Sequence, residues 1–157
     1  MIYQFNREWL VKKFQEIQRR ILLVMEQLSE EQLNWKPNEQ SHRIANLVLH
    51  IEGNIKERIA KGILHQNIVR DREAEFSAVF ISKAELTAIV EGNFNFLIDI
   101  VSKLTDRELE QTQLVRNKER TNIDILHQCA AHYSEHMGQI FYIAKLCLNE
   151  SYKSTSI

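Results

Sequence analysis

Glycine and proline are scarce in this sequence, which has four glycines and one proline in 157 residues. Sheets joined by tight turns use more of both residues, so their scarcity favours long helices. No apolar run approaches the roughly 18 residues that indicate a membrane-spanning helix. No apolar signal-peptide core follows Met1. We therefore expect a soluble protein without a membrane partner.

Cysteine is also rare, and neither sign of charge predominates. Cys129 and Cys147 do not form a CxxC pair, which fits a reducing cytoplasm better than a disulfide-stapled secreted chain. The 20 Lys and Arg against 21 Asp and Glu give a net charge of -1. Such a chain has no overall field that attracts nucleic acid, so we expect no nucleic-acid partner. Its length suits a single domain, which we place over residues 1–157.

Apolar residues recur at spacings of three and four in four segments, which predicts four amphipathic helices. The segments are roughly 3–28, 41–62, 82–104 and 122–148. The stripes at this spacing, apolar except for Asn93, are, in chain order, Leu10, Phe14, Ile17, Ile21, Val24 and Leu28; Ile44, Leu47, Val48, Ile51, Ile55 and Ile59; Leu86, Ile89, Asn93, Leu97, Ile100 and Leu104; and Leu126, Ala130, Tyr133, Met137, Ile140 and Ala144.

Residues at the segment ends predict where these helices begin and stop. Ser41 is a candidate cap for the second helix, and Gly62 fits its C-terminal end. Ser82 can cap the third, with Glu85 as its capping-box partner. We expect residues 63–80 to form a long connection with a helical turn, and residues 105–120 a polar link. With no strand pattern between the helices, the predicted fold class is all-α, a four-helix bundle.

Two of the six histidines stand four residues apart in the fourth segment, as His132-Tyr133-Ser134-Glu135-His136. On a helix this spacing places both rings on one face, with Cβ atoms roughly 5–6 Å apart. Two such imidazoles can bind one ion at a zinc–nitrogen distance of roughly 2.0–2.1 Å. The spacing also arises by chance, so two neutral, hydrogen-bonded histidines are the alternative interpretation.

His50 is a candidate third ligand. With Asn46 and Asn54, one turn to either side, it forms a polar ridge beside the apolar stripe of the second helix. Such a ridge is where a bundle can hold an interior site. Alone, His50 would favour a hydrogen bond at a helix seam. With the pair at His132 and His136, we predict a three-histidine site for one divalent ion, zinc or nickel among those that imidazole suits.

The other histidines are expected at the surface: His42 at a helix start, His65 in the long connection, and His127 turned away from His132. Cys129 lies three residues before His132 and seven before His136, on the same face of the helix. It is a candidate fourth ligand, although we prefer a buried thiol that packs as a small apolar residue.

The same five residues also fit H-x-x-E-H, the pattern of a metalloprotease class in which two histidines bind zinc and the Glu is a general base. The stretch after His136 is short for a further ligand and a peptide groove. We therefore prefer a solvated Glu135.

Two sequence blocks and the helical layout resemble the DinB/YfiT-like superfamily of metal-binding helical bundles. The blocks are Leu33-Asn34-Trp35-Lys36-Pro37 with the following 44–51, and 132–140. The charged run 70–76 resembles a branch of that superfamily without an assigned function. The resemblance implies an up-down-down-up bundle, a three-histidine site at His50, His132 and His136, and a homodimer. Many relatives have Arg where this chain has Met137, which leaves the ligands intact but affects contacts around them.

The superfamily includes enzymes that join low-molecular-weight thiols to electrophiles. Three histidines leave a coordination position open, which is typical of catalytic sites, and a thiol there would lose its proton to become a nucleophile. We therefore expect a metal-dependent thiol S-transferase whose partners are a small thiol and an electrophilic small molecule. No catalytic residue is assigned; Glu135, Asn54 and Gln139 are candidates for contacts around the ligands or the substrate.

Three alternatives stay open. A metal-dependent hydrolase would use the same position to activate water. A non-catalytic metal-binding or stress-response protein would need no open position. A purely structural helical module would leave the histidines without a metal.

Overall fold

Four long helices bury their apolar stripes against one another in a computed structural model that describes residues 1–156. The long helices are α1 (Gln4–Glu26), α3 (Ile44–Ile55), α5 (Lys83–Lys103) and α7 (Asn122–Leu148). The shorter elements are α2 (Glu30–Leu33), the π-helix η1 (Lys56–Lys61), α4 (Arg72–Glu75), α6 (Asp106–Glu110), β1 (Thr112–Val115), β2 (Lys118–Thr121) and the 3-10 turn η2 (Asn149–Ser151).

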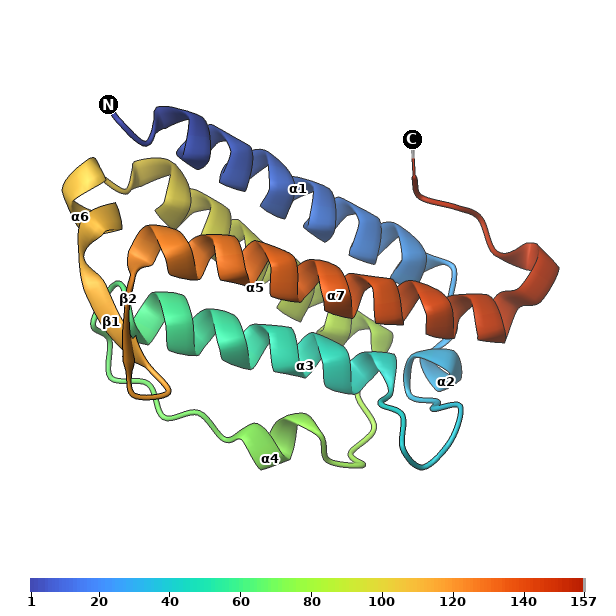
Figure 1. The fold of residues 1–157 in the computed structure, drawn as a ribbon. Coiled ribbons are helices and arrows are strands. Elements are labelled where there is room, and N and C mark those ends of the chain that lie inside the picture. The colour runs from blue at the N-terminus through green and yellow to red at the C-terminus, as the bar shows by residue number, and fades with distance from the viewer. Residues whose placement is uncertain (157) are drawn as a thin grey trace.

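The long helices follow an up-down-down-up order. Figure 1 shows α1 and α7 running in one direction and α3 and α5 in the other. In the bundle, α5 packs against both α1 and α3, and α7 also packs against both α1 and α3. Because α3 and α5 are parallel, the chain between them has to return along the length of the bundle, and it carries α4 across the outside of α3 (Figure 1). The expected all-α bundle is confirmed.

Three of the four predicted stripes are fully buried, and the third helix differs. Its buried positions are Leu86, Val90, Phe94, Leu97 and Val101. The predicted Ile89, Asn93 and Ile100 are only partly buried. Both sets have helical spacing, and the face that carries Val90, Phe94 and Val101 is the one that packs in the core.

The second helix begins later than predicted. Ser41 does not cap it, because the Ser41 hydroxyl bonds to Asn38 Oδ1 at 3.0 Å within a preceding turn. The α-helix starts at Ile44, where the backbone N–H of Arg43 donates to Asn46 Oδ1 at 3.2 Å. The helical segment ends at Gly62 as expected, but its last six residues form η1 rather than α-helix. Ser82 caps α5 as predicted, accepting from the backbone N–H of Glu85 at 3.1 Å.

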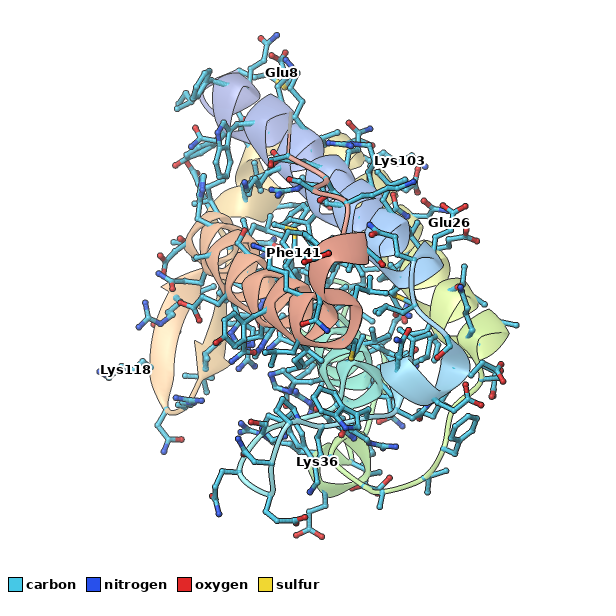
Figure 2. The ribbon with its side chains drawn as sticks, turned by 90° about the vertical axis from the view of Figure 1, so that its right-hand side faces the viewer. Glu8, Glu26, Lys36, Lys103, Lys118 and Phe141 are labelled. Atoms are coloured by element: carbon cyan, nitrogen blue, oxygen red, sulfur yellow. The ribbon has the colours of Figure 1, made fainter. Side chains whose placement is uncertain are left out.

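The polar link 105–120 is more structured than predicted. It holds α6 and an antiparallel hairpin of β1 and β2, joined by a two-residue turn at Arg116 and Asn117, with φ of 50° and 64°. Two positive φ values are typical of hairpin turns whose twist matches that of the strands. The short strands and the glycine-free turn gave no clear sequence signal. Figure 2 shows the hairpin standing beside the bundle, with Lys118 at its outer edge.

The structure also bears on membrane insertion. Within residues 1–156, no helix combines the length and the apolar character that crossing a bilayer requires.

Candidate metal centre

The antiparallel packing of α3 against α7 brings the three predicted histidines together. Nε2 of His50 lies 3.1 Å from Nε2 of His132, which lies 3.2 Å from Nε2 of His136. One ligand atom from each of the three rings falls within 4.8 Å of the others. The cluster can therefore hold a metal ion, and it joins positions that are 82 residues apart in the chain.

Burial keeps the rings of His50 and His132 neutral. His50 is 5% exposed, and burial is the main cause that lowers its pKa below the ordinary value. For His132, burial and then the neighbouring imidazoles lower the pKa to about 4. Both rings therefore have unprotonated nitrogen available at neutral pH, which is the state that binds metal.

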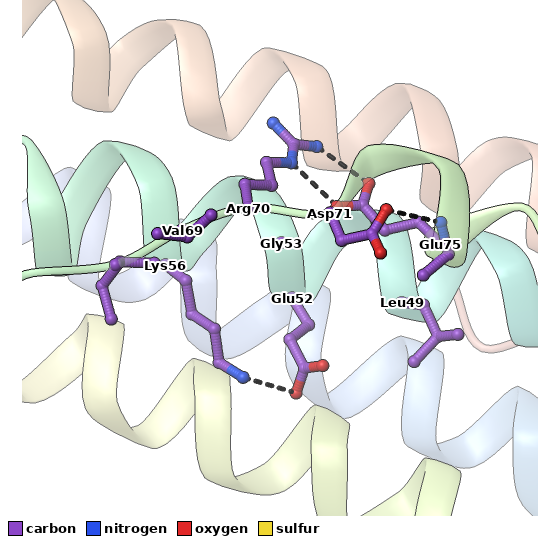
Figure 3. A pocket seen from close by; sticks show the side chains of 10 residues that line it. Leu49, Glu52, Gly53, Lys56, Val69, Arg70, Asp71 and Glu75 are labelled. Atoms are coloured by element: carbon purple, nitrogen blue, oxygen red, sulfur yellow. Dashed lines mark hydrogen bonds and ion pairs between the residues drawn. The ribbon is translucent and has the colours of Figure 1, made fainter.

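A buried ion-pair network lies behind His50. Glu75 Oε1, on α4, is 3.0 Å from Nδ1 of His50. Arg70 contacts the same carboxylate through Nε at 2.8 Å and a terminal nitrogen at 3.0 Å (Figure 3). Its other terminal nitrogen lies 2.8 Å from Oε2 of Glu57. With Nδ1–H donating to the carboxylate, the lone pair of Nε2 faces the cluster.

Gly53 makes room for this network. A Cβ at Gly53 would overlap Oε2 of Glu75 and lie 3.1 Å from Nε of Arg70. Glycine in the middle of a helix is destabilising by roughly 0.5–1 kcal/mol relative to alanine. Here it lets the carboxylate rest against the backbone of α3 (Figure 3).

The side chain of Gln139 orients the ring of His136. Its Nδ1 lies 2.7 Å from Oε1 of Gln139, so an Nδ1–H that donates to this oxygen leaves Nε2 unprotonated toward the cluster. Gln139, one of the residues singled out in the sequence, therefore contacts a ring of the cluster.

Asn54 and Cys129 lie next to the cluster but outside it. Asn54 Oδ1 accepts a hydrogen bond from the Tyr133 hydroxyl at 2.7 Å and lies 3.9 Å from Cys129 Sγ. Burial raises the pKa of Cys129 to about 11, so its thiol is protonated at neutral pH. Cys129 is a packed thiol, as preferred from the sequence, and is not one of the clustered ligands.

The remaining candidates lie elsewhere. Glu135 is exposed on α7, consistent with a solvated carboxylate rather than a general base beside the cluster. His42 and His65 are exposed, as expected. The prediction that His127 lies at the surface is wrong in part, because the residue is half-buried. Its Nε2 lies 3.1 Å from Asn6 Nδ2, and its ring is tilted against that of Trp9 at 5.6 Å between centroids.

Glu57, Arg70 and Glu75 were not predicted from the sequence as parts of the site. Arg70 and Glu75 belong to a charged run, and charged runs are usually solvated. One signal in the sequence is that acidic residues and arginines occur together in a long connection, because ion pairs between them allow charged side chains to be buried.

Comparisons with known proteins show a similar fold and the family of this chain. The fold is similar to that of YjoA, a DinB-like protein from Bacillus subtilis, with a TM-score of 0.68 and 15% identity over 95% of this chain and 96% of that one. At this identity the likeness concerns the fold alone. The comparison with curated proteins gave no match. Residues 4–157 match the family described as "Protein of unknown function (DUF1572)". The chain therefore belongs to the DUF1572 family, and its fold is DinB-like.

Proposed function

We propose that this protein is a metal-dependent enzyme that uses one divalent ion, zinc or nickel, held by His50, His132 and His136. We further propose that it transfers a low-molecular-weight thiol to an electrophilic small molecule. The observation that carries the proposal is the convergence of three Nε2 atoms, with separations of 3.1 and 3.2 Å.

These separations fit a metal site. A tetrahedral ion at roughly 2.0–2.1 Å from each nitrogen holds its ligands about 3.3–3.4 Å apart. The two separations differ from that by only a few tenths of an ångström. Neutral rings that turn their lone pairs toward one another repel unless a cation or a proton lies between them.

The groups around the rings also suit a divalent cation. Glu75 and Gln139 fix the tautomers of His50 and His136, and the carboxylate increases the basicity of its ring. Arg70 balances the charge of Glu75, so an ion would sit on neutral ligands and keep its own positive charge.

The donor set leaves room for a substrate group. Three protein ligands with an open fourth position are typical of catalytic rather than structural zinc. When bound, a divalent ion supplies a charge that lowers the pKa of a thiol in that position. Cys129 stays protonated at neutral pH, so it does not supply the nucleophile itself. We infer that a bound small thiol supplies it.

The first test is metal content. The protein would be purified without chelator and without a nickel column, beside His132→Ala and a matched control, His127→Ala, on the same helix. We expect about one ion per chain in the wild type and the control, and little in His132→Ala. No metal in the wild type, even after reloading with zinc or nickel, would overturn the proposal.

The second test is turnover. Wild type and His132→Ala would be incubated with several small thiols and a chromogenic aryl halide. We expect conjugation that depends on both metal and His132. A metal-loaded wild type without conjugation for any thiol would remove the transferase part and leave a metal-binding protein.

A further inference from the structure

A cavity of about 380 Å³ lies beside the histidine cluster, between η1, α7 and the hairpin. His132 is part of its wall, so the cavity adjoins the candidate metal centre. Four of its ten lining residues are basic and none is acidic: Arg58, Arg116, Lys118 and Arg120. The whole chain has a net charge of -1, so this concentration of positive charge is local.

The register of the hairpin places its basic side chains and its acidic side chain on opposite faces. Val115 pairs with Lys118, and Gln113 with Arg120, so these four side chains share one face. Val115, Lys118 and Arg120 line the cavity from that face. The acid between them, Glu119, lies on the opposite face and contacts Thr112 at 3.4 Å. Because side chains alternate between the two faces of a strand, Lys118 and Arg120 face the cavity and Glu119 faces away from it.

The hairpin is fastened to the bundle at this point. Gln113 Nε2 donates to the backbone carbonyl of Arg58 at 3.1 Å and to Asn122 Oδ1 at 3.0 Å. Gly62 allows this approach, since a Cβ there would overlap Gln113 Oε1. The cavity wall is therefore held by specific contacts between β1 and η1.

The positive charge in the cavity is only partly neutralised. Arg58 lies 3.3 Å from Glu57, but that carboxylate is also paired with Arg70 at 2.8 Å. Arg120 pairs with Asp124 at 2.9 Å. Arg116 and Lys118 have no carboxylate within ion-pair distance in the part of the chain that the structure describes.

We propose that this cavity binds a carboxylate or phosphate group of the small molecule whose reacting end reaches the histidine cluster. This inference rests on the proposed function and names its substrate class, a small organic anion. Arginine and lysine are the side chains that recognise both groups, arginine through paired N–H donors and lysine as a point charge. A neutral or cationic substrate would leave the basic wall without a partner.

The test uses cobalt-loaded protein, in which a thiolate bound to the ion gives a charge-transfer absorption band. Two probes of similar size would be titrated, mercaptosuccinate, which carries two carboxylates, and monothioglycerol, which is uncharged. The test variant is Arg116→Gln with Lys118→Gln. The control, Lys36→Gln with Lys103→Gln, removes the same charge from sites away from the cavity (Figure 2).

We expect the wild type to bind mercaptosuccinate at least about tenfold more tightly than monothioglycerol, a modest preference for two partly solvated charge contacts. The preference should fall below about threefold in the hairpin variant and persist in the control. Equal binding of the two probes by the wild type, or equal losses in both variants, would overturn the proposal while leaving the metal site intact.

A second arm does not depend on metal. Succinate and glycerol phosphate would be titrated separately into metal-free protein, and the amide resonances of residues 112–121 followed by NMR. Saturable shifts that the hairpin variant loses support the cavity, and the anion that binds more tightly distinguishes carboxylate from phosphate. If neither anion shifts these amides, the proposal fails. Failure to bind cobalt, by contrast, counts against the proposed function alone.

Discussion

Gly53→Ala tests the arrangement behind His50 more sharply than removal of any charged group. The new methyl group would overlap Oε2 of Glu75 and lie 2.7 Å from its Cδ, so the carboxylate has to move. The displaced atoms end a flexible side chain, but they also bond to His50 and Arg70. Moving them breaks contacts that orient the ring.

Two expected effects of Gly53→Ala on the free energy of unfolding have opposite signs. Alanine is favoured over glycine in a helix by about 1 kcal/mol. Loss of partners for the buried Glu75 costs about 1–3 kcal/mol, so the free energy of unfolding should stay level or fall. Loss of a group that orients a metal ligand typically weakens metal binding by about 10–100-fold. Metal affinity is therefore expected to change far more than stability.

Gly92→Ala is the matched control. Gly92 lies on α5, and a Cβ added there would have nothing within 4 Å, so this variant should gain up to about 1 kcal/mol and bind metal normally. Both variants would be compared by urea unfolding with chelator present and by zinc competition with a chromophoric chelator. If Gly53→Ala binds zinc as tightly as Gly92→Ala and is equally stabilised, Glu75 does not orient His50.

Three further predictions concern protonation and burial. His132 has an ordinary pKa of 6.5 when unfolded and about 4 when folded. The unfolded chain therefore takes up a proton first, and the metal-free protein should lose about 1–2 kcal/mol as pH falls from 6.5 to 4, allowing for partial solvent screening; urea midpoints that do not change over this range would contradict it. Tyr133→Phe removes a buried hydroxyl bonded to Asn54 and should cost about 1–3 kcal/mol in urea unfolding, whereas an unchanged midpoint would mean that water replaces the bond. Iodoacetamide should label the half-buried Cys147 well before Cys129, whose pKa burial raises to about 11, and mass spectrometry showing the reverse order would indicate that the α3–α7 seam opens readily.

Helical spacing was enough to predict the bundle and the meeting of the three histidines. Stripes such as Leu10, Phe14 and Ile17 define which face of a helix is buried. The i, i+4 spacing of His132 and His136 places both rings on one face of the helix. His50 could be added because its neighbours Asn46 and Asn54 are polar beside a core stripe.

The surroundings of the cluster could not be predicted in the same way. Glu75 lies 25 residues after His50, beyond the end of α3, η1 and an irregular stretch, and no periodic pattern encodes such a contact. The change from α-helix to π-helix after Ile55 depends on backbone hydrogen bonds that side-chain spacing does not reveal. The hairpin was missed because Arg116 and Asn117 take positive φ without the glycine that usually indicates such a turn.

The connection that returns along α3 has a consequence for any ion in the cluster. It is held largely by polar contacts, such as Asn46 Nδ2 to the carbonyls of Glu75 and Ser77, while Val69 and Val79 are 91% and 66% exposed. Segments with few buried apolar contacts open locally at a lower free energy than the core. The connection can therefore detach, taking Glu75 from His50, while the four long helices stay folded. During each such opening the cluster would bind an ion more weakly, because His50 loses the carboxylate that orients it, without any global unfolding of the bundle.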